Sequence, residues 1–75
     1  MKFNTLFSAD VFHAIKKSGF TQAEVAEMVD ISVRNYQYIE QGRFIPHGDT
    51  LLKLIYLFDL DIDRYREVLG MPKRD

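Results

Sequence analysis

The side chains best suited to recognition by hydrogen bonding lie between Ser32 and Gly42. If this segment is a helix, Tyr36 and Ile39 point inward at a spacing of three and leave a long polar face on the other side. The outward side chains are those of Arg34, Asn35, Gln37, Tyr38 and Gln41. Only Arg34 among them is charged, and its planar guanidinium can donate two parallel hydrogen bonds at once. The segment therefore offers a nearly uncharged hydrogen-bonding surface.

The histidines and acidic residues of the chain are not spaced as in a catalytic site or a metal site. His13 and His47 are far apart in the chain and have no carboxylate or thiol at ligand spacing. The run Asp59, Asp61 and Asp63 resembles calcium ligands, but it lacks the glycine and the distal glutamate of an EF-hand loop. No Ser-His-Asp order, glycine-rich phosphate loop or pair of acids stands out. We therefore predict no enzyme, with no catalytic residue, metal, cofactor or small-molecule substrate.

Capping residues and apolar spacing predict an all-α chain of five short helices. Ser8 is expected to cap the first helix and Gly19 to end it in the left-handed conformation. Thr21 and Glu24 form a capping box at the start of the second helix, where each serves a backbone N–H of the other. Ser32 is expected to cap the third. The expected helices cover residues 8–18, 21–29, 33–41, 49 or 50 to 58, and 61–69.

The last two helices are predicted from apolar stripes after the loop that contains Pro46, which bars helix continuation. The first stripe recurs at intervals of three, four and seven residues. The second follows an expected cap at Asp61. These stripes consist of Leu51, Leu54, Ile55 and Phe58, and of Ile62, Tyr65 and Leu69. The tail, residues 71–75, is expected to fray.

Composition indicates one small domain, residues 1–75, in the cytoplasm. The chain is 47% hydrophobic and 28% charged, which is too apolar for a disordered segment. It has no cysteine, its first residues do not resemble a signal peptide, and no apolar run approaches the roughly 20 residues of a membrane span. We therefore expect no disulfide and no membrane association.

Residues 21–42 predict a helix-turn-helix unit. Two capped helices joined by only a few residues cross at a steep angle, and the corner needs a small side chain where they touch. Ala26 supplies it, Ile31 is expected to plug the turn, and Tyr36 and Ile39 close the buried side. The outer helix is then free to enter a groove, and the major groove of B-DNA, about 12 Å wide, accepts one α-helix.

In these residues and their spacing, the chain resembles the phage-repressor and Cro-like (XRE-like) helix-turn-helix regulators. The matching residues are Gly19-Phe20-Thr21-Gln22, Val25-Ala26, Ile31-Ser32, Ile39-Glu40-Gln41-Gly42, Pro46 and Thr50-Leu51-Leu52-Lys53-Leu54. The resemblance implies a compact five-helix, lambda-repressor-like DNA-binding domain with a central helix-turn-helix. It also implies a transcription regulator that inserts the helix of about residues 33–41 into the major groove of a double-stranded operator.

The chain departs from the family at three positions. Asp30 stands where the turn usually has glycine, so an aspartate must adopt the left-handed conformation at some cost. Tyr36 replaces a buried aliphatic residue, and its hydroxyl must find water or another partner. Ile15 stands where many members have an arginine that pairs with the glutamate matching Glu40. We therefore expect Glu40 to face solvent or to pair with another cation such as Arg43.

The resemblance assigns phosphate contacts to one set of residues. Gln22 would hold a phosphate through its amide and nearby free N–H groups, although it can also be an ordinary residue at the start of a helix. Ser32 and Asn35 would hold the DNA backbone around the third helix, and Ser32 is a cap as well. Arg43 is well placed for the phosphate backbone.

It assigns base contacts to a second set. Arg34 can bond O6 and N7 of guanine, although an outward arginine on a helix is often only solvated. Val33 can press on a thymine methyl, and Tyr38 can touch a sugar or a base edge. Either of them can instead cover the core or contact a protein. Gln37 lies on the adjoining rim.

Charge and aromatic content leave further alternatives open. The net charge of −1 is unusual for a DNA-binding protein, but the acids cluster toward the end of the chain, while Lys16, Lys17, Arg34 and Arg43 lie in or near residues 21–42. Ten aromatic side chains predict a homodimer built through the last helix, the N-terminal segment or both, or else they pack in the core. The alternative function is a protein-interaction or antitoxin-like module with weak DNA affinity, which the net acidity favours.

Overall fold

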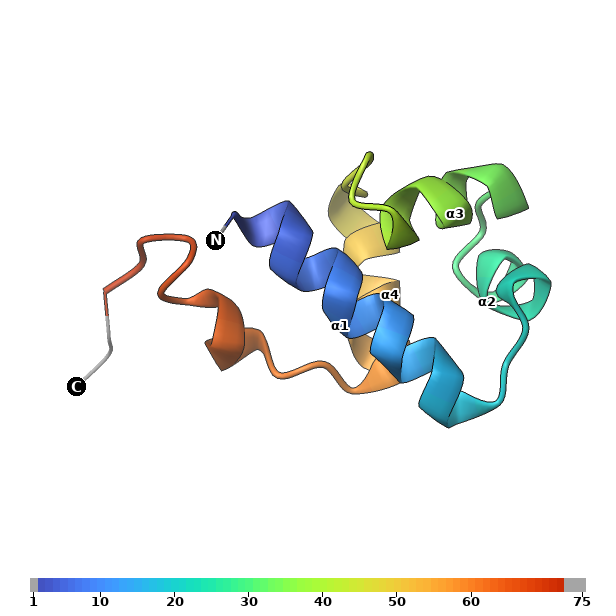
Figure 1. The fold of residues 1–75 in the computed structure, drawn as a ribbon, viewed down its shortest axis with the longest axis horizontal. Coiled ribbons are helices and arrows are strands. Elements are labelled where there is room, and N and C mark those ends of the chain that lie inside the picture. Colours follow the sequence, from blue (N-terminus) through green and yellow to red (C-terminus); the bar gives the residue numbers. More distant parts are fainter. Residues whose placement is uncertain (1, 73–75) are drawn as a thin grey trace.

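The computed structural model describes residues 2–72, which form four α-helices and one short 3-10 helix, with no strand among them. The elements are α1 (Phe3–Ser18), α2 (Gln22–Met28), α3 (Val33–Glu40), α4 (Gly48–Phe58) and η1 (Ile62–Tyr65) (Figure 1). The prediction of an all-α fold is confirmed. The predicted count of five α-helices is wrong, because the last element is a single 3-10 turn.

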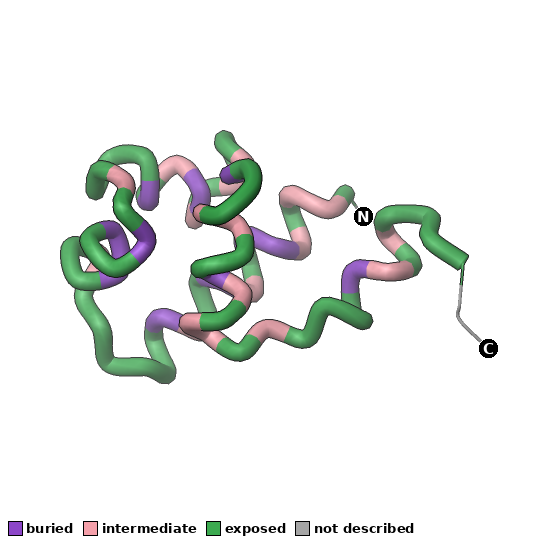
Figure 2. The backbone as a smooth tube through the Cα atoms, turned by 180° about the vertical axis from the view of Figure 1, so that it is seen from behind, coloured by how far each residue is buried: buried purple, intermediate pink, exposed green. Residues whose placement is uncertain are grey.

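α1 is the central element of the fold. It packs against α3, α4 and η1, whereas α2 packs against α3. Figure 1 shows α2 and α3 together at one end of the molecule, with the segment after α4 at the other end. In Figure 2 the buried residues lie on the sides of the helices that face one another. The helix-turn-helix pair is therefore held by α1 and presented at one end.

The core is apolar and is shared by all five elements. Its fully or nearly fully buried residues are Phe7, Val11, Ile15, Val25, Ala26, Val29, Tyr36, Ile39, Leu54 and Tyr65. Ala26, predicted as the small residue of the helical corner, is only 2% exposed, and Ile31 packs against the core as expected. Tyr36 and Ile39, predicted to point inward, are fully buried.

α1 begins at Phe3, five residues before the predicted cap at Ser8. The reason is that apolar residues recur upstream: the rings of Phe3 and Phe7 stack with centroids 5.5 Å apart, and Phe3 also packs edge-on against Tyr65 at 5.2 Å. Burial of these rings stabilises an extra helical turn and a half. Ser8 is buried inside the helix, and its hydroxyl donates to the Thr5 carbonyl at 3.1 Å rather than capping.

The predicted helix 61–69 is replaced by η1 and a series of turns. Asp61 caps η1, as expected for the last helix: its Oδ1 accepts the Asp63 N–H at 3.1 Å. Of its predicted stripe, however, only Tyr65 is buried, while Ile62 is 62% and Leu69 53% exposed. A single buried side chain stabilises a single turn, because short helices depend on tertiary packing. The predicted frayed tail lies partly outside the described residues.

The other predicted helix boundaries agree closely with the structure. Gly19 ends α1 in the left-handed region, with φ +80°. Thr21 Oγ1 accepts the Glu24 N–H at 3.1 Å, and Glu24 Oε1 accepts the Thr21 N–H at 2.9 Å, so the predicted capping box is confirmed. Ser32 Oγ accepts the Asn35 N–H at 3.1 Å. α2 and α3 therefore start at residues specified by local hydrogen bonds.

Candidate nucleic-acid interface

The corner between α2 and α3 spans only four residues, 29–32. Asp30 occupies the left-handed region with φ +61°, as predicted for the residue that replaces glycine. The Asp30 N–H donates to the Glu27 carbonyl at 3.2 Å, and the Ile31 N–H donates to the Ala26 carbonyl at 2.9 Å. These two bonds satisfy the end of α2 and turn the chain sharply into α3.

α3 exposes the side on which most of the predicted contact residues lie. Its buried side carries Tyr36 and Ile39, both fully enclosed. The helix cap and the opposite side expose Ser32, Val33, Arg34, Asn35 and Gln37, whereas Tyr38 is half-buried. Val33 is 40% exposed, so its apolar side chain is available at the start of the helix. The structure thus brings six of the eight predicted residues onto α3 and its cap.

Arg43 joins this surface from the turn that ends α3. Gly42 adopts φ +73°, and the Arg43 N–H donates to the Tyr38 carbonyl at 2.9 Å. The Arg43 guanidinium carbon lies 4.9 Å from the centre of the Tyr38 ring, a cation–π contact. A Cβ at residue 42 would lie 3.2 Å from the Ser8 hydroxyl, so a side chain there would press on α1. Tyr38 and Arg43 are therefore presented as a pair.

Gln22, the eighth predicted residue, takes part in a hydrogen-bonded chain that crosses from α2 to α3. Its Nε2 donates to Glu40 Oε1 at 3.0 Å, and its Oε1 accepts from Gln37 Nε2 at 3.1 Å. The expectation that Glu40 faces solvent or pairs with Arg43 is therefore wrong. With Ile15 in place of an arginine, the amide of Gln22 supplies the donor that the carboxylate requires.

Sequence reasoning missed this chain of three side chains, which we call the glutamine relay (Glu40, Gln22 and Gln37). A signal for it was present, because the absence of an arginine at Ile15 left Glu40 in need of a donor. Gln22 stands at the first position of α2, opposite the end of α3. An amide of that length at that corner is able to reach the carboxylate.

Two side-chain oxygen atoms of α3 are buried without a hydrogen-bond partner among the described residues. They are the Tyr36 hydroxyl and Glu40 Oε2, one helical turn apart on α3. Burial raises the pKa of the Tyr36 hydroxyl well above its ordinary value of 10.0, and the neighbouring Glu40 carboxylate raises it further. The Tyr36 site is therefore less well satisfied than it would be with a buried aliphatic residue, which has no polar atom to pair.

Two arginines on α3 and in the turn after it carry positive charge that is not used in an ion pair among the described residues. The ion pairs among the described residues join Lys53 to Asp49, Arg64 to Asp10 and Arg66 to Asp63. Arg34 and Arg43 are in none of these pairs. The helix pair and its corner also carry four acidic residues: Glu24 and Glu40 accept hydrogen bonds from a backbone N–H and from an amide, while Glu27 and Asp30 are exposed.

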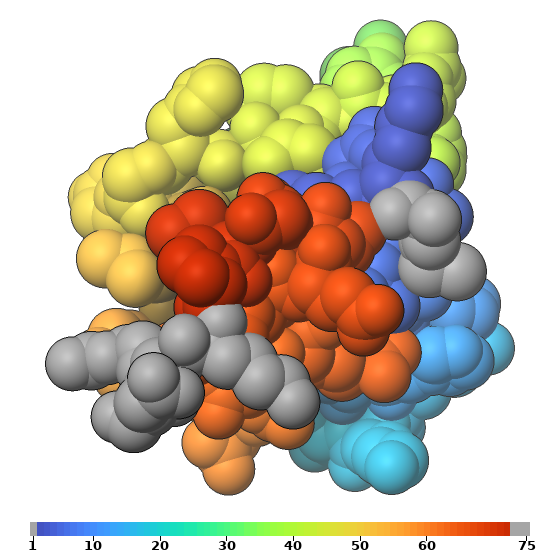
Figure 3. All heavy atoms as spheres, turned by 90° about the vertical axis from the view of Figure 1, so that its left-hand side faces the viewer, coloured from blue at the N-terminus to red at the C-terminus, as the bar shows by residue number. Residues whose placement is uncertain are grey.

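A second polar cluster joins η1 to α1, far along the chain from the corner. Arg64 Nε and Nη2 donate to the two carboxylate oxygens of Asp10 at 3.1 and 3.2 Å, and the Tyr65 hydroxyl donates to Asp10 Oδ2 at 2.7 Å. In Figure 3 the segment after α4, orange to red, lies against the blue N-terminal part of α1. No spacing or motif in the sequence predicted this link.

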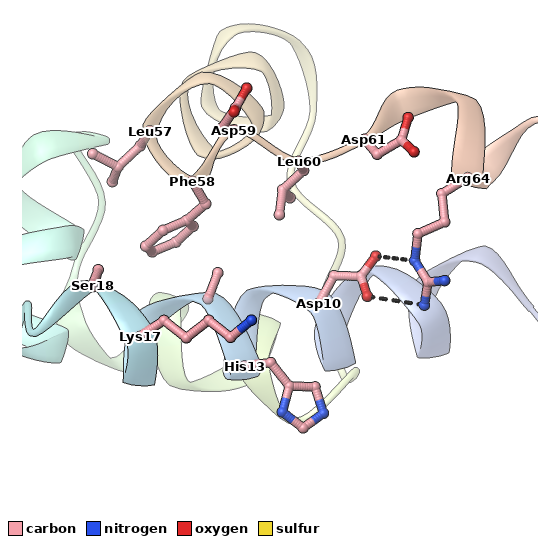
Figure 4. Close-up of a pocket in the computed structure, with 11 residues that line it drawn as sticks. Asp10, His13, Lys17, Ser18, Leu57, Phe58, Asp59, Leu60, Asp61 and Arg64 are labelled. Carbon is pink, nitrogen blue, oxygen red and sulfur yellow. Dashed lines mark hydrogen bonds and ion pairs between the residues drawn. The ribbon is translucent and has the colours of Figure 1, made fainter.

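A hollow of about 460 Å³ lies between α1 and the end of α4 (Figure 4). Figure 4 shows Phe58 and Leu60 on one side of it, and the bonded pair of Asp10 and Arg64 at one end. The two opposite charges at this end are bonded to each other, which indicates packing of η1 on α1.

Within residues 2–72, no three histidine or acidic side chains cluster to hold a metal ion. No helix described here is long and apolar enough to cross a membrane.

Comparison with known proteins agrees with this geometry. Residues 13–65 match the family described as helix-turn-helix. Over 50 residues the chain is 40% identical to the HTH-type transcriptional regulator ImmR of Bacillus subtilis (strain 168), an alignment that covers 67% of this chain and 39% of that protein. The chain thus matches well under two thirds of that relative. No solved structure matches the chain. The chain belongs to the XRE-type helix-turn-helix family, a family of DNA-binding transcription regulators and not of enzymes.

Proposed function

We propose that this chain is a sequence-specific DNA-binding transcription regulator that inserts α3 into the major groove of an operator. The observation that carries the proposal is the division of α3 into two faces. Tyr36 and Ile39 fix the helix from below, while Val33, Arg34 and Gln37 are exposed above them. An exposed helix held rigidly by its buried face is what major-groove recognition requires.

The contact residues divide by their chemistry. Arg34 is suited to bidentate contact with O6 and N7 of guanine, Val33 to a thymine methyl, and Tyr38 to a sugar or a base edge. Ser32, Asn35 and Arg43 are suited to phosphate oxygens. Gln22 still has a second amide N–H beyond the one that it gives to Glu40, so a phosphate contact from the start of α2 remains open to it.

We propose in addition that the chain acts as one domain, in the cytoplasm and as a homodimer. Several apolar side chains are exposed on α4 and just after it: Leu52 is 53%, Tyr56 81% and Ile62 62% exposed. A second copy packed there would cover them and would present two α3 helices to a two-fold operator. Of the N-terminal aromatics, Phe7 is fully buried and Phe3 packs on it, whereas Phe12 is 39% exposed, so α1 offers less apolar surface to a second copy than α4 does.

The same apolar patch and the net charge of −1 favour a second candidate function, a protein-interaction or antitoxin-like module with weak DNA affinity. A hollow of about 220 Å³ lies between Leu52, Tyr56 and Ile62, where a partner's side chain can fit. If this alternative function holds, the helix-turn-helix serves only as a scaffold, and the exposed face of α3 does not need to bind DNA.

Selection of bound duplexes from a random DNA pool separates the two functions. The regulator is expected to enrich a defined site, and Arg34→Ala is expected to relax the preference at one base position. Lys53→Ala is the matched control, since it also removes one positive charge but lies on α4 in an exposed pair with Asp49. Failure to enrich any site would support the interaction module instead.

A further inference from the structure

We propose that Gln37 determines specificity for adenine, and that Glu40 acts as a positioning residue that sets the orientation of the Gln37 amide through Gln22. The inference rests on the proposed DNA-binding function and goes beyond it by naming the base and the device that selects it. Its basis is the glutamine relay, whose two hydrogen bonds measure 3.0 and 3.1 Å.

The direction of the relay is set by its charged end. A carboxylate only accepts hydrogen bonds, so the group of Gln22 that faces Glu40 Oε1 must be its NH₂. The carbonyl of Gln22 is then the group that remains for Gln37, and it can only accept. Gln37 must therefore turn its own NH₂ toward Gln22. Without Glu40, either amide can rotate by 180° and exchange its donor for its acceptor.

The consequence lies on the exposed face of α3. One N–H of Gln37 is used within the relay, which leaves its second N–H and both lone pairs of its carbonyl oxygen for a ligand. A glutamine with a fixed donor beside a fixed acceptor matches adenine, whose N7 accepts and whose N6 donates in the major groove. Because Gln37 is exposed whereas Glu40 is partly buried, the residue that contacts the base and the residue that orients it are distinct.

The cost of the device is visible in the structure. Glu40 Oε2 is buried and has no hydrogen-bond partner among the described residues, so this carboxylate is kept at a position where it is incompletely satisfied. A buried acceptor without a partner is destabilising.

Site selection followed by affinity measurements tests the proposal with Gln37→Ala, Glu40→Gln and the control Gln41→Ala. Gln41 is an exposed glutamine at the end of the same helix, with no side-chain hydrogen bond among the described residues. Gln37→Ala is expected to lower the preference for adenine at one base position by about one to two orders of magnitude. Glu40→Gln is expected to lower the preference at that same position, while the preference at the Arg34 position stays unchanged.

The outcomes are distinct. If the wild-type chain selects a site and neither Gln37→Ala nor Glu40→Gln alters one common adenine position, the inference is overturned while DNA binding stands. If Glu40→Gln weakens binding equally at every position, Glu40 has only a structural role. If Gln41→Ala has the same effect as Gln37→Ala, the relay is not the cause. If no duplex is bound at all, the proposed function fails first.

Discussion

The Tyr65 hydroxyl donates a 2.7 Å hydrogen bond to Asp10 Oδ2, which joins two residues 55 positions apart in the chain. Tyr65 is nearly fully buried, whereas the side chain of Arg64, which binds the same carboxylate, is 53% exposed. Hydrogen bonds to a charged group in a buried setting contribute more than exposed ion pairs. The attachment of η1 to α1 therefore depends on the tyrosine more than on the arginine.

Substitutions at these two positions should differ in cost. Tyr65→Phe is expected to lower the free energy of unfolding by about 1.5–3 kcal/mol. Arg64→Ala is expected to lower it by less than about 1 kcal/mol, since water screens the exposed pair. Urea denaturation of both variants beside the wild type measures this. An Arg64→Ala variant that is less stable than Tyr65→Phe would contradict the ranking.

Stability is expected to fall in alkaline solution. Burial, and then the bond to Asp10, raises the pKa of Tyr65 above its ordinary 10.0, and burial raises the pKa of Tyr36 in the same direction. Both phenols stay protonated in the folded chain while the unfolded chain loses its protons, so their contribution is complete below pH 10 and declines above it. Each steepens the loss by about 1.4 kcal/mol per pH unit. Thermal unfolding between pH 8 and 11 should decline less steeply for Tyr65→Phe, and an unchanged slope would exclude Tyr65 as a cause.

Tyr36 offers a case in which removing a polar atom should do no harm. Its hydroxyl is buried without a partner among the described residues, so Tyr36→Phe is expected to leave the free energy of unfolding unchanged or to raise it by up to about 1 kcal/mol. Tyr36→Ala removes the buried ring itself and should cost about 3–5 kcal/mol. Chemical denaturation compares the two. A loss above about 1 kcal/mol for Tyr36→Phe would mean that the hydroxyl is bonded in solution.

The turn of the helix pair is open to improvement. Asp30 has φ +61°, a conformation that costs an L-residue roughly 1–2 kcal/mol and costs glycine little. Asp30→Gly is therefore expected to raise the free energy of unfolding by about 0.5–1 kcal/mol, and Asp30→Ala to lower it. Thermal melts of the two variants provide the comparison. The reverse order would show that the aspartate side chain stabilises the turn.

The proposed homodimer is tested by sedimentation equilibrium. At high micromolar concentration the mass is expected to be twice the 8.8 kDa of the chain, because the exposed apolar side chains of α4 gain from burial. Tyr56→Asp should shift the mass toward the monomer without loss of helicity. A wild-type monomer under these conditions would rule out the dimer.

Local signals predicted the middle of the chain well. Thr21, Glu24 and Ser32 form their caps with near neighbours, so the starts of α2 and α3 were readable from the sequence, and the exposed side of α3 followed from the spacing of Tyr36 and Ile39. These features depend on residues three or four positions apart.

Features that depend on contacts between residues far apart in the chain could not be predicted from the sequence. The early start of α1 is stabilised by Tyr65, which packs on Phe3 from the far end of the chain. The loss of the last helix follows from the absence of a surface to bury Ile62 and Leu69. The bond between Gln22 and Glu40 joins residues 18 positions apart, and no periodicity reports it.

The measurement that tests the central claim most directly is the affinity of the chain for a random-sequence duplex across a series of salt concentrations. If the exposed face of α3 binds DNA, the logarithm of the affinity should fall linearly with the logarithm of salt concentration, and Arg43→Ala should make the slope shallower by about one. Lys53→Ala should leave that slope unchanged. An affinity that is absent at low salt, or that does not vary with salt, would contradict the assignment of this chain as a DNA-binding regulator.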